Sequence, residues 1–328
     1  MTDEERRQLM AQLEQPKVNK RARLQALGIP ESTYYQWRQQ FEMQGSEGLI
    51  KHKPQARRVW NRLTESETGT VLQIARAYPE LSPRLLAVKI TDEEPFSVSE
   101  TKVYQLLKAA GLIAPRPLAD LPASREWRHK TTRPNELWQI DATQLFVVDW
   151  GFYKLIPVLD DFSRKVLAET LEPDETAGSI SKAVEAAVAA TGVPDMPADL
   201  KPRLLSDNGA GFTAELLDGY LTAHGIRHIF GRPYHPQTQG KIERLNRRLK
   251  ERLCLVVYLS PDELRQAIRE AIETYNETPH EALKNVSPND VYAGRQAEIL
   301  QKRQDKKAWT LARRRVHNLA LAGSVNEN

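Results

Sequence analysis

The residues best suited to chemistry in this chain are three carboxylates in three different local settings. Asp141 lies in the apolar run LWQIDATQLFV, Asp207 precedes an Asn-Gly pair, and Glu243 lies in a run rich in Lys and Arg. Three ionised carboxylates repel one another, so such a cluster is stable mainly when divalent cations neutralise it. The trio therefore predicts a catalytic site that holds Mg²⁺ or Mn²⁺, as a pair of ions suited to displacement at phosphorus.

Asp141 and Asp207 are each expected on a strand of a sheet. The side chain of Asp141 would lie among large apolar residues, where an unpaired charge is costly unless it meets a cation. Asn208-Gly209 ends the strand after Asp207 and leaves its carboxylate at the carboxyl end, where α/β sheets bind ligands. The structural alternatives are an Asp at a sheet edge for Asp141 and a turn-capping Asp for Asp207.

Glu243 is expected on a helix. The 35 residues between Asp207 and Glu243 suit an acid at a strand end that faces an acid on a later helix. One stripe of this helix is apolar and should be buried: Ile242, Leu245, Leu249 and Leu253. Another face follows i, i+3, i+4, i+7 spacing and carries Glu243, Asn246, Arg247 and Lys250. We expect this face to join the metal site to a DNA backbone, the alternative being a salt-bridged surface Glu.

Other polar residues near the trio are assigned to structure or to a secondary role. Asp160 and Asp161 fit a strand end, where they can cap the bend or bind a nearby arginine. Residues 234–240 form a loop rich in hydrogen-bonding groups, and we expect it to close over DNA near the site. Within this loop His235 is a candidate DNA contact, and a satisfied loop histidine is the alternative.

The composition is that of a globular protein with two or three domains. The 328 residues are 40% hydrophobic and 27% charged. No apolar run approaches the roughly 18 residues of a membrane span. The acidic start MTDEERRQLM lacks the regions of a signal peptide, so we expect a cytoplasmic, nucleoid-associated protein without membrane contact. The one cysteine, Cys254, cannot form an internal disulfide, and the histidines show no zinc-site spacing.

Charge is unevenly distributed, although the net charge is only +4. From Leu137 to Gly240 there are 14 Asp or Glu against 8 Lys or Arg, whereas Lys241 to Arg252 carries 6 basic and 2 acidic residues. The tail from Gly294 onward has 8 basic and 3 acidic residues. This distribution favours a protein that holds metal at its centre and a polyanion around it. Any one such run alone is more typical of a solvated face.

Residues 1–56 predict a first helix-turn-helix unit. One helix closes near Leu27, a turn with Gly and Pro follows, and Ser32 is expected to cap a second helix. That second helix carries Arg38, a candidate DNA contact. Two short helices joined by Gly or Ser can also mimic this pattern without binding DNA, which is the alternative.

Residues 57–114 predict a second unit of the same kind, compatible with a winged form. Ser99 begins a candidate recognition helix in which Lys102 and Gln105 point outward. We therefore expect Lys102 and Gln105 to contact DNA. Tandem helical units of this kind are typical of DNA-binding proteins.

The pattern changes after the second unit. Residues 115–135 contain prolines and basic residues without an apolar period, which is typical of a linker. Residues 136–293 show three consecutive strand patterns and then alternating helices and strands, which predicts a mixed α/β sheet. Residues 294–328 are expected to form a basic helical tail.

Five motifs occur in a fixed order between about Leu137 and Ala293: LWQIDAT, VLDDFSRKV, LLSDNGAGF, YHPQTQGKIERLNRRLK and YNETPHEALKNVSPNDVYA. Together they resemble bacterial insertion-sequence transposases with a retroviral-integrase-like DDE core. The resemblance implies a ribonuclease-H-like mixed sheet, preceded by the tandem helix-turn-helix units and followed by the basic helical region. It also implies that Asp141 lies on the first strand, Asp207 at the end of the fourth and Glu243 on a later helix.

The resemblance implies a DNA transposase that performs metal-dependent 3′-end cleavage and strand transfer. Its expected partners are double-stranded DNA, as terminal inverted repeats and target, and further copies of itself, because two DNA ends must be joined together. Two alternatives stay open at this stage. One is a sequence-specific DNA-binding regulator with an inactive integrase-like core, and the other is a ribonuclease-H-like nuclease that does not join strands.

Overall fold

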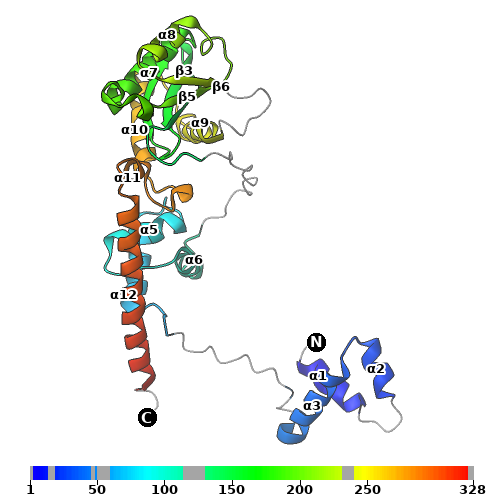
Figure 1. Ribbon diagram of the computed structural model, residues 1–328. Helices are drawn as coiled ribbons and strands as arrows, with labels where there is room; N and C mark the ends of the chain where they lie inside the picture. Colours follow the sequence, from blue (N-terminus) through cyan, green and yellow to red (C-terminus); the bar gives the residue numbers. More distant parts are fainter. Residues whose placement is uncertain are drawn as a thin grey trace. The chain divides into compact units, whose positions relative to one another are not determined.

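The computed structural model describes residues 3–13, 19–45, 49, 60–113, 130–230 and 240–323 (Figure 1). The chain divides into two units, and each is described by itself. One unit comprises Met1–Arg62 with Arg314–Asn328, and the other comprises Leu63–Arg313. Within the described ranges, no helix combines the length and the apolar character needed to cross a membrane.

The N-terminal part of the first unit is a bundle of three helices: α1 (Asp3–Leu13), α2 (Lys20–Ala26) and α3 (Glu31–Gln44). Leu13, Leu24 and Tyr34 are at most 2% exposed and form the centre of its core. The turn between α2 and α3 passes through Gly28 at φ +65°, a left-handed conformation that favours glycine. The prediction that Ser32 caps α3 is wrong, because Pro30 occupies the cap position and Ser32 already lies in the first turn.

A second helical group opens the other unit: α4 (Glu65–Ala77), α5 (Pro83–Glu93) and α6 (Glu100–Ala109). Ser99 accepts a hydrogen bond from Lys102 N at 3.4 Å and caps α6, as the sequence predicts. Val103 and Leu107 of α6 are buried against α4 and α5. Residues 60–113 contain no strand, so a wing is absent from this range.

The core that follows is built on a six-stranded mixed sheet. Its strands are β1 (Leu137–Ile140), β2 (Thr143–Val147), β3 (Gly151–Asp160), β4 (Val166–Glu172), β5 (Arg203–Ser206) and β6 (Arg227–Phe230). The strands are ordered β2-β3-β1-β5-β6, and β4 also pairs with β3. β3 is antiparallel to β1, β2 and β4, whereas β1, β5 and β6 are parallel to one another. Only this parallel part brings the carboxyl ends of β1 and β5 to the same edge.

The first core segment is two strands rather than the one that the sequence predicts. β1 pairs Ile140 with Val158, and β2 pairs Thr143 with Leu155, so the register against β3 is the same on both sides of the break. Continuing that register places Asp141 opposite Pro157. Because proline has no N–H to donate, the ladder is interrupted there, and Asp141 lies between two strands instead of within one.

Helices cover both faces of the sheet (Figure 1). On one face α7 (Ala177–Thr191) and α8 (Glu215–Ala223) pack with Trp138, Ile140 and Ile156. On the other face α9 (Gly240–Leu253) and α10 (Pro261–Glu277) pack with Leu145, Leu155 and Leu159. Short 3₁₀ turns connect these elements: η2 (Val193–Asp195), η3 (Ala198–Leu200) and η5 (Glu281–Leu283). The sheet is therefore buried on both sides and holds its strand ends rigidly.

The end of the segment predicted as a linker is part of the core. Asn135 N donates to Asp160 Oδ1 at 2.8 Å, and the Trp138 indole donates to Asn135 Oδ1 at 3.0 Å. Asn135 is buried, and its amide also reaches the Tyr292 hydroxyl at 2.8 Å. Hydrogen bonding to the core thus begins before residue 136.

The C-terminal region consists of α11 (Pro288–Tyr292) and the long helix α12 (Gln296–Gly323). Part of α12 lies beside α5 (Figure 1) and is bound to its end. Arg303 makes two bonds with the Asp92 carboxylate, at 2.7 and 2.6 Å, and Lys306 donates to three backbone carbonyls between Thr91 and Glu94. The fold class predicted from the sequence is confirmed: a ribonuclease-H-like mixed sheet lies between an N-terminal helix-turn-helix region and a helical C-terminal region.

Candidate active site

Asp141 is the most buried of the three predicted catalytic acids. Its position between β1 and β2 leaves its carboxylate largely inside the protein, where Asn246 Nδ2 donates to Oδ2 at 2.9 Å. The pKa of Asp141 is raised to about 6, with burial as the largest cause and the charges of Asp207 and Glu243 as smaller ones. The hydrogen bonds from Asn246 and from the Ala142 backbone act in the opposite direction.

Asp207 directly follows β5 and is exposed. In the parallel pair, Gln139 of β1 is in register with Leu205 of β5, and two further residues along each chain place Asp141 beside Asp207. The Asp207 carboxylate accepts a bond from Gly209 N at 2.9 Å, which closes a tight turn. A Cβ at Gly209 would lie 3.0 Å from Asp207 Oδ1, so a side chain there would crowd this carboxylate in its present position.

Glu243 lies in the first turn of α9 and is exposed. The apolar stripe expected for this helix is buried, with every member at most 3% exposed: Ile242, Leu245, Leu249 and Leu253. A carboxylate in the first turn is favoured by the partial positive charge of the helix N-terminus. Packing of this stripe on the sheet therefore points Glu243 toward the edge that carries Asp141.

Asp207 and Glu243 are each close enough to Asp141 for their charges to raise its pKa. Among the described residues, no three His, Cys, Asp or Glu side chains lie close enough together to form a ready ligand set. Two of the three, Asp207 and Glu243, are exposed side chains that can change rotamer.

Asn246 does not lie on an exposed, DNA-facing surface, where the sequence predicts it. Its side chain is buried and bonds Asp141, because this part of α9 faces the sheet rather than solvent. Its Oδ1 atom is also buried and has no hydrogen-bond partner within the described residues. Asn246 therefore orients Asp141 in this structure.

A clamp at the start of α9 was missed by sequence reasoning. Gln139 of β1 accepts from Ile242 N at 3.1 Å and donates to Asp161 Oδ1 at 2.7 Å. Asp161 is 5% exposed, and its Oδ2 atom receives Lys241 Nζ at 2.7 Å and the Thr131 hydroxyl at 2.7 Å. We call Gln139, Asp161 and Lys241 the α9 clamp, because they fix the turn that carries Glu243. The available signal was a polar Gln inside an otherwise apolar strand.

Asp160 and Asp161 have different tasks. Asp160 is fully buried and receives bonds from the Ser163 backbone and hydroxyl, at 2.8 and 2.6 Å. It therefore caps the bend after β3, which is one of the two roles expected from the sequence.

The predicted DNA-contacting residues lie in three places. Gln105 of α6 is exposed and Lys102 is half-buried, whereas Arg38 of α3 is ion-paired with Glu42 at 2.8 Å. On α9, Arg247 is exposed and Lys250 is half-buried. His235 lies outside the described residues. None of these roles is tested by the geometry alone.

Family comparisons identify the class of domain that carries this site. Two models of the integrase core domain match residues 131–236 and 224–288, and a model of a homeodomain-like domain matches residues 33–107. The chain thus contains a region that matches the integrase core domain, preceded by a region that matches a homeodomain-like domain.

Similar sequences occur in retroviral polyproteins. The Gag-Pro-Pol polyprotein of sheep pulmonary adenomatosis virus is 30% identical over 154 residues, which are 47% of this chain and 8% of the polyprotein. The Gag-Pol polyprotein of woolly monkey sarcoma virus is 31% identical over 126 residues, which are 38% of this chain and 7% of the polyprotein. This chain thus spans less than a tenth of the length of these relatives.

Similar solved structures include two retroviral assemblies. The HTLV-2 integrase catalytic core domain in complex with magnesium, in its trimeric form, is 24% identical with a TM-score of 0.38 and covers 49% of this chain and 97% of its own. A simian T-cell lymphotropic virus intasome is 21% identical with a TM-score of 0.43 and covers 68% of this chain and 74% of its own.

Proposed function

We propose that this protein is a DDE transposase that binds the ends of an insertion element, cleaves their 3′ ends and joins them to target DNA. The observation that carries the proposal is the arrangement of Asp141. This half-buried carboxylate is held by Asn246 and is influenced by the charges of Asp207 and Glu243, at the edge where β1 and β5 end. A protein keeps such a set of like charges when a cation and a phosphate use it.

Asp141, Asp207 and Glu243 would hold the divalent cations, Mg²⁺ or Mn²⁺. The donor set fits hard cations, because it consists of carboxylate oxygens and because the raised pKa of Asp141 reflects a charge in need of compensation. When bound, such cations stabilise charge on the transferring phosphate and favour ionisation of the attacking oxygen.

Other residues of the chain hold the catalytic carboxylates in position. Asn246 orients the Asp141 carboxylate, and the α9 clamp holds the helix turn that presents Glu243. In this proposal Arg247 and Lys250, further along α9, would contact the DNA backbone, and His235 is a further candidate. Water as nucleophile gives 3′-end cleavage, and the freed 3′ hydroxyl as nucleophile gives strand transfer, so one site performs both steps without a covalent protein intermediate.

Recognition of the element ends is assigned to the helix-turn-helix region. Arg38 on α3, and Lys102 and Gln105 on α6, lie on helices suited to the major groove. Backbone contacts give salt-sensitive affinity, and base contacts give the sequence preference. Two element ends are joined to one target, so we propose that the protein acts as a homo-oligomer assembled on DNA.

A strand-transfer assay with the native flanking DNA, in Mg²⁺ and in EDTA, tests this function. Asp141→Asn, Asp207→Asn and Glu243→Gln should each lower cleavage and joining by at least about a hundredfold, because each removes charge from the reacting centre. Binding to element ends in a mobility-shift assay should persist in all three. Asp195→Asn, at an exposed acid outside the site, is the matched control.

Strand transfer that survives in any of the three variants would refute the assignment of that residue. Cleavage without joining in the unaltered protein would instead support a nuclease. Specific DNA binding with neither reaction would support a regulator.

A further inference from the structure

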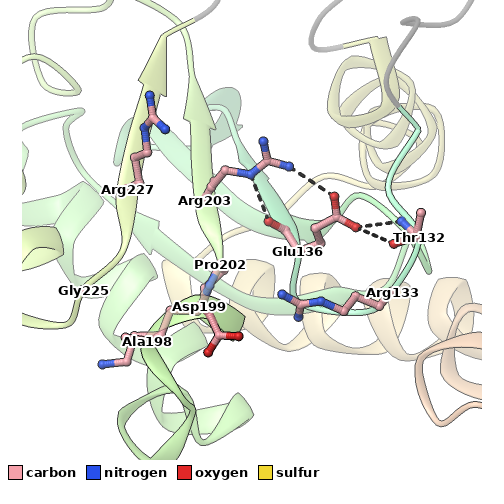
Figure 2. A pocket seen from close by; sticks show the side chains of 10 residues that line it. Thr132, Arg133, Glu136, Ala198, Asp199, Pro202, Arg203, Gly225 and Arg227 are labelled. Atoms are coloured by element: carbon pink, nitrogen blue, oxygen red, sulfur yellow. Dashed lines mark hydrogen bonds and ion pairs between the residues drawn. The ribbon is translucent and has the colours of Figure 1, made fainter.

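A polar pocket of about 510 Å³ opens at the edge of the sheet where β5 and β6 begin (Figure 2). Its volume lies within the range of small-ligand sites. β5 runs from Arg203 at this pocket to Ser206, next to Asp207, so the pocket is about 13 Å from the candidate active site along the strand. It lies at the opposite edge of the sheet and is a separate feature.

Cationic side chains outnumber acids in this pocket. Its charged lining residues are Arg133, Glu136, Asp199, Lys201, Arg203 and Arg227. One of the two acids, Glu136, already has partners. Its Oε1 atom pairs with Arg203 Nη2 at 3.2 Å, and its Oε2 atom accepts a hydrogen bond from Thr132 N at 2.7 Å. Burial raises the pKa of Glu136, but the Thr132 bonds and the Arg203 charge outweigh it and hold that pKa below its usual range. Glu136 thus neutralises one arginine, and three cations remain against one further acid, Asp199.

The three remaining cations have no carboxylate partner within the described residues. Arg133 Nη1 donates to the Leu200 carbonyl at 3.2 Å, and Lys201 Nζ donates to the His224 carbonyl at 2.9 Å. These carbonyls orient the two cations without cancelling their charge. Arg227 is exposed and makes no side-chain hydrogen bond or ion pair in this part of the chain.

Strand pairing places two of the arginines next to each other. In the parallel pair of β5 and β6, Arg203 is in register with Arg227, and Figure 2 shows both side chains on the same side of the sheet. Like charges on neighbouring strands are destabilising unless another group compensates them, and Glu136 compensates only Arg203 of this pair. An anion between Arg227 and the other cations would supply that compensation.

Gly225 keeps one wall of the pocket open. It has φ +69°, and a Cβ there would lie 3.0 Å from Lys201 Cδ and 3.4 Å from Lys201 Nζ. Any larger residue would push against the Lys201 side chain that reaches the His224 carbonyl. A glycine at position 225 therefore leaves room for the Lys201 side chain.

From this geometry we infer that the pocket binds a phosphate group, held by Arg227 together with Arg133 and Lys201. Guanidinium and ammonium groups are the donors that proteins use for phosphate, and the arginine fork matches its oxygens. The phosphate comes either from a DNA backbone that passes outside the active site or from a free phosphate compound. This inference goes beyond the proposed reaction and does not require the three acids to be catalytic.

The variant Arg227→Gln tests the inference, because it removes an exposed cation without breaking a described contact. Two properties of the full chain are measured: the thermal midpoint in inorganic phosphate against chloride at equal ionic strength, and the salt dependence of affinity for a duplex lacking element ends. Arg133→Gln is the second variant. Arg265→Gln is the matched control, since Arg265 is an exposed arginine on α10 that pairs within its own helix at 2.7 Å.

If a DNA backbone supplies the phosphate, Arg227→Gln lowers the slope of log affinity against log salt by about one, and Arg265→Gln does not. If a free phosphate occupies the pocket, phosphate raises the midpoint of the unaltered protein, Arg227→Gln and Arg133→Gln lose that rise, and the DNA slope stays unchanged. Identical behaviour of the Arg227→Gln variant and the unaltered protein in both measurements overturns the inference. Strand transfer is not measured, so failure of the catalytic assignment leaves this test intact.

Discussion

At the scale of single residues, the carboxylate proposed to bind metal at the candidate site lowers the stability of the folded protein. Asp141 is a half-buried carboxylate that directly follows a strand, and its pKa is raised to about 6, mainly by burial and to a lesser extent by the charges of Asp207 and Glu243. In the ionised form that predominates at neutral pH, this charge destabilises the folded protein relative to the unfolded chain. The hydrogen bond from Asn246 offsets only part of that cost.

We therefore expect Asp141→Asn to increase the free energy of unfolding in EDTA at pH 7.5, by on the order of 2 kcal/mol. The amide carries no charge, and its oxygen can still accept the bond from Asn246. Urea unfolding followed by circular dichroism measures the change. Asp195→Asn, at an exposed position, should change stability by less than about 0.5 kcal/mol.

The pH dependence gives this prediction a second check. Because the folded pKa of Asp141 is raised, its favourable contribution is complete below the unfolded value near 3.8 and is lost as pH rises through about 6. The difference between Asp141→Asn and the unaltered protein should thus shrink as pH falls from 7.5 toward 4.5. A variant that is less stable at pH 7.5 would contradict the account.

At the scale of elements, the clamp at the start of α9 is what connects the sheet to Glu243. Gln139 lies on β1 two residues before Asp141, which follows the end of that strand, so a single segment both carries one acid and holds the helix that carries another. Asp161 is nearly inaccessible to solvent and depends on Lys241 for charge compensation. The α9 clamp therefore fixes the separation of Asp141 and Glu243 through contacts that belong to the fold.

We expect Lys241→Met to lower the free energy of unfolding by about 2–3 kcal/mol, since it leaves the buried Asp161 carboxylate without a cation. Arg247→Met is the control on the same helix, because Arg247 pairs with Glu251 at 4.0 Å between exposed side chains. That change should cost less than about 1 kcal/mol. Equal effects of the two substitutions on urea unfolding would show that the Asp161 pair contributes no special stability.

The sequence predicts well those features that depend on local pattern. The apolar stripe of α9 and the turn after Asp207 follow from spacing and from Asn-Gly chemistry, and the structure has both. The break at Asp141 was not predictable, because it arises from Pro157 on a partner strand. The burial of Asn246 was missed for a related reason: helix periodicity defines faces but does not say which face the sheet covers.

At the scale of the whole molecule, several cations of the basic C-terminal helix α12 form contacts within the protein. Lys306 reaches three carbonyls at the carboxyl end of α5, where a cation also meets the negative end of the helix dipole. Arg303 holds Asp92 through two bonds, and Arg313 pairs with the buried Glu67 at 2.7 Å. These cations join α12 to the second helical group, so the tail is more than the polyanion-binding segment that its composition predicts.

Lys306→Met should loosen this junction, because three carbonyls at the end of α5 lose a charged donor worth roughly 1–3 kcal/mol. The expected result is faster amide hydrogen exchange in the last turn of α5 and in the adjoining part of α12, with exchange in the sheet unchanged. Lys307→Met is the matched control: Lys307 is the next residue of the same helix, is exposed, and makes no side-chain contact among the described residues. If the two variants exchange at the same rate, Lys306 does not hold α12 on α5, and the tail's cations are free to act on DNA instead.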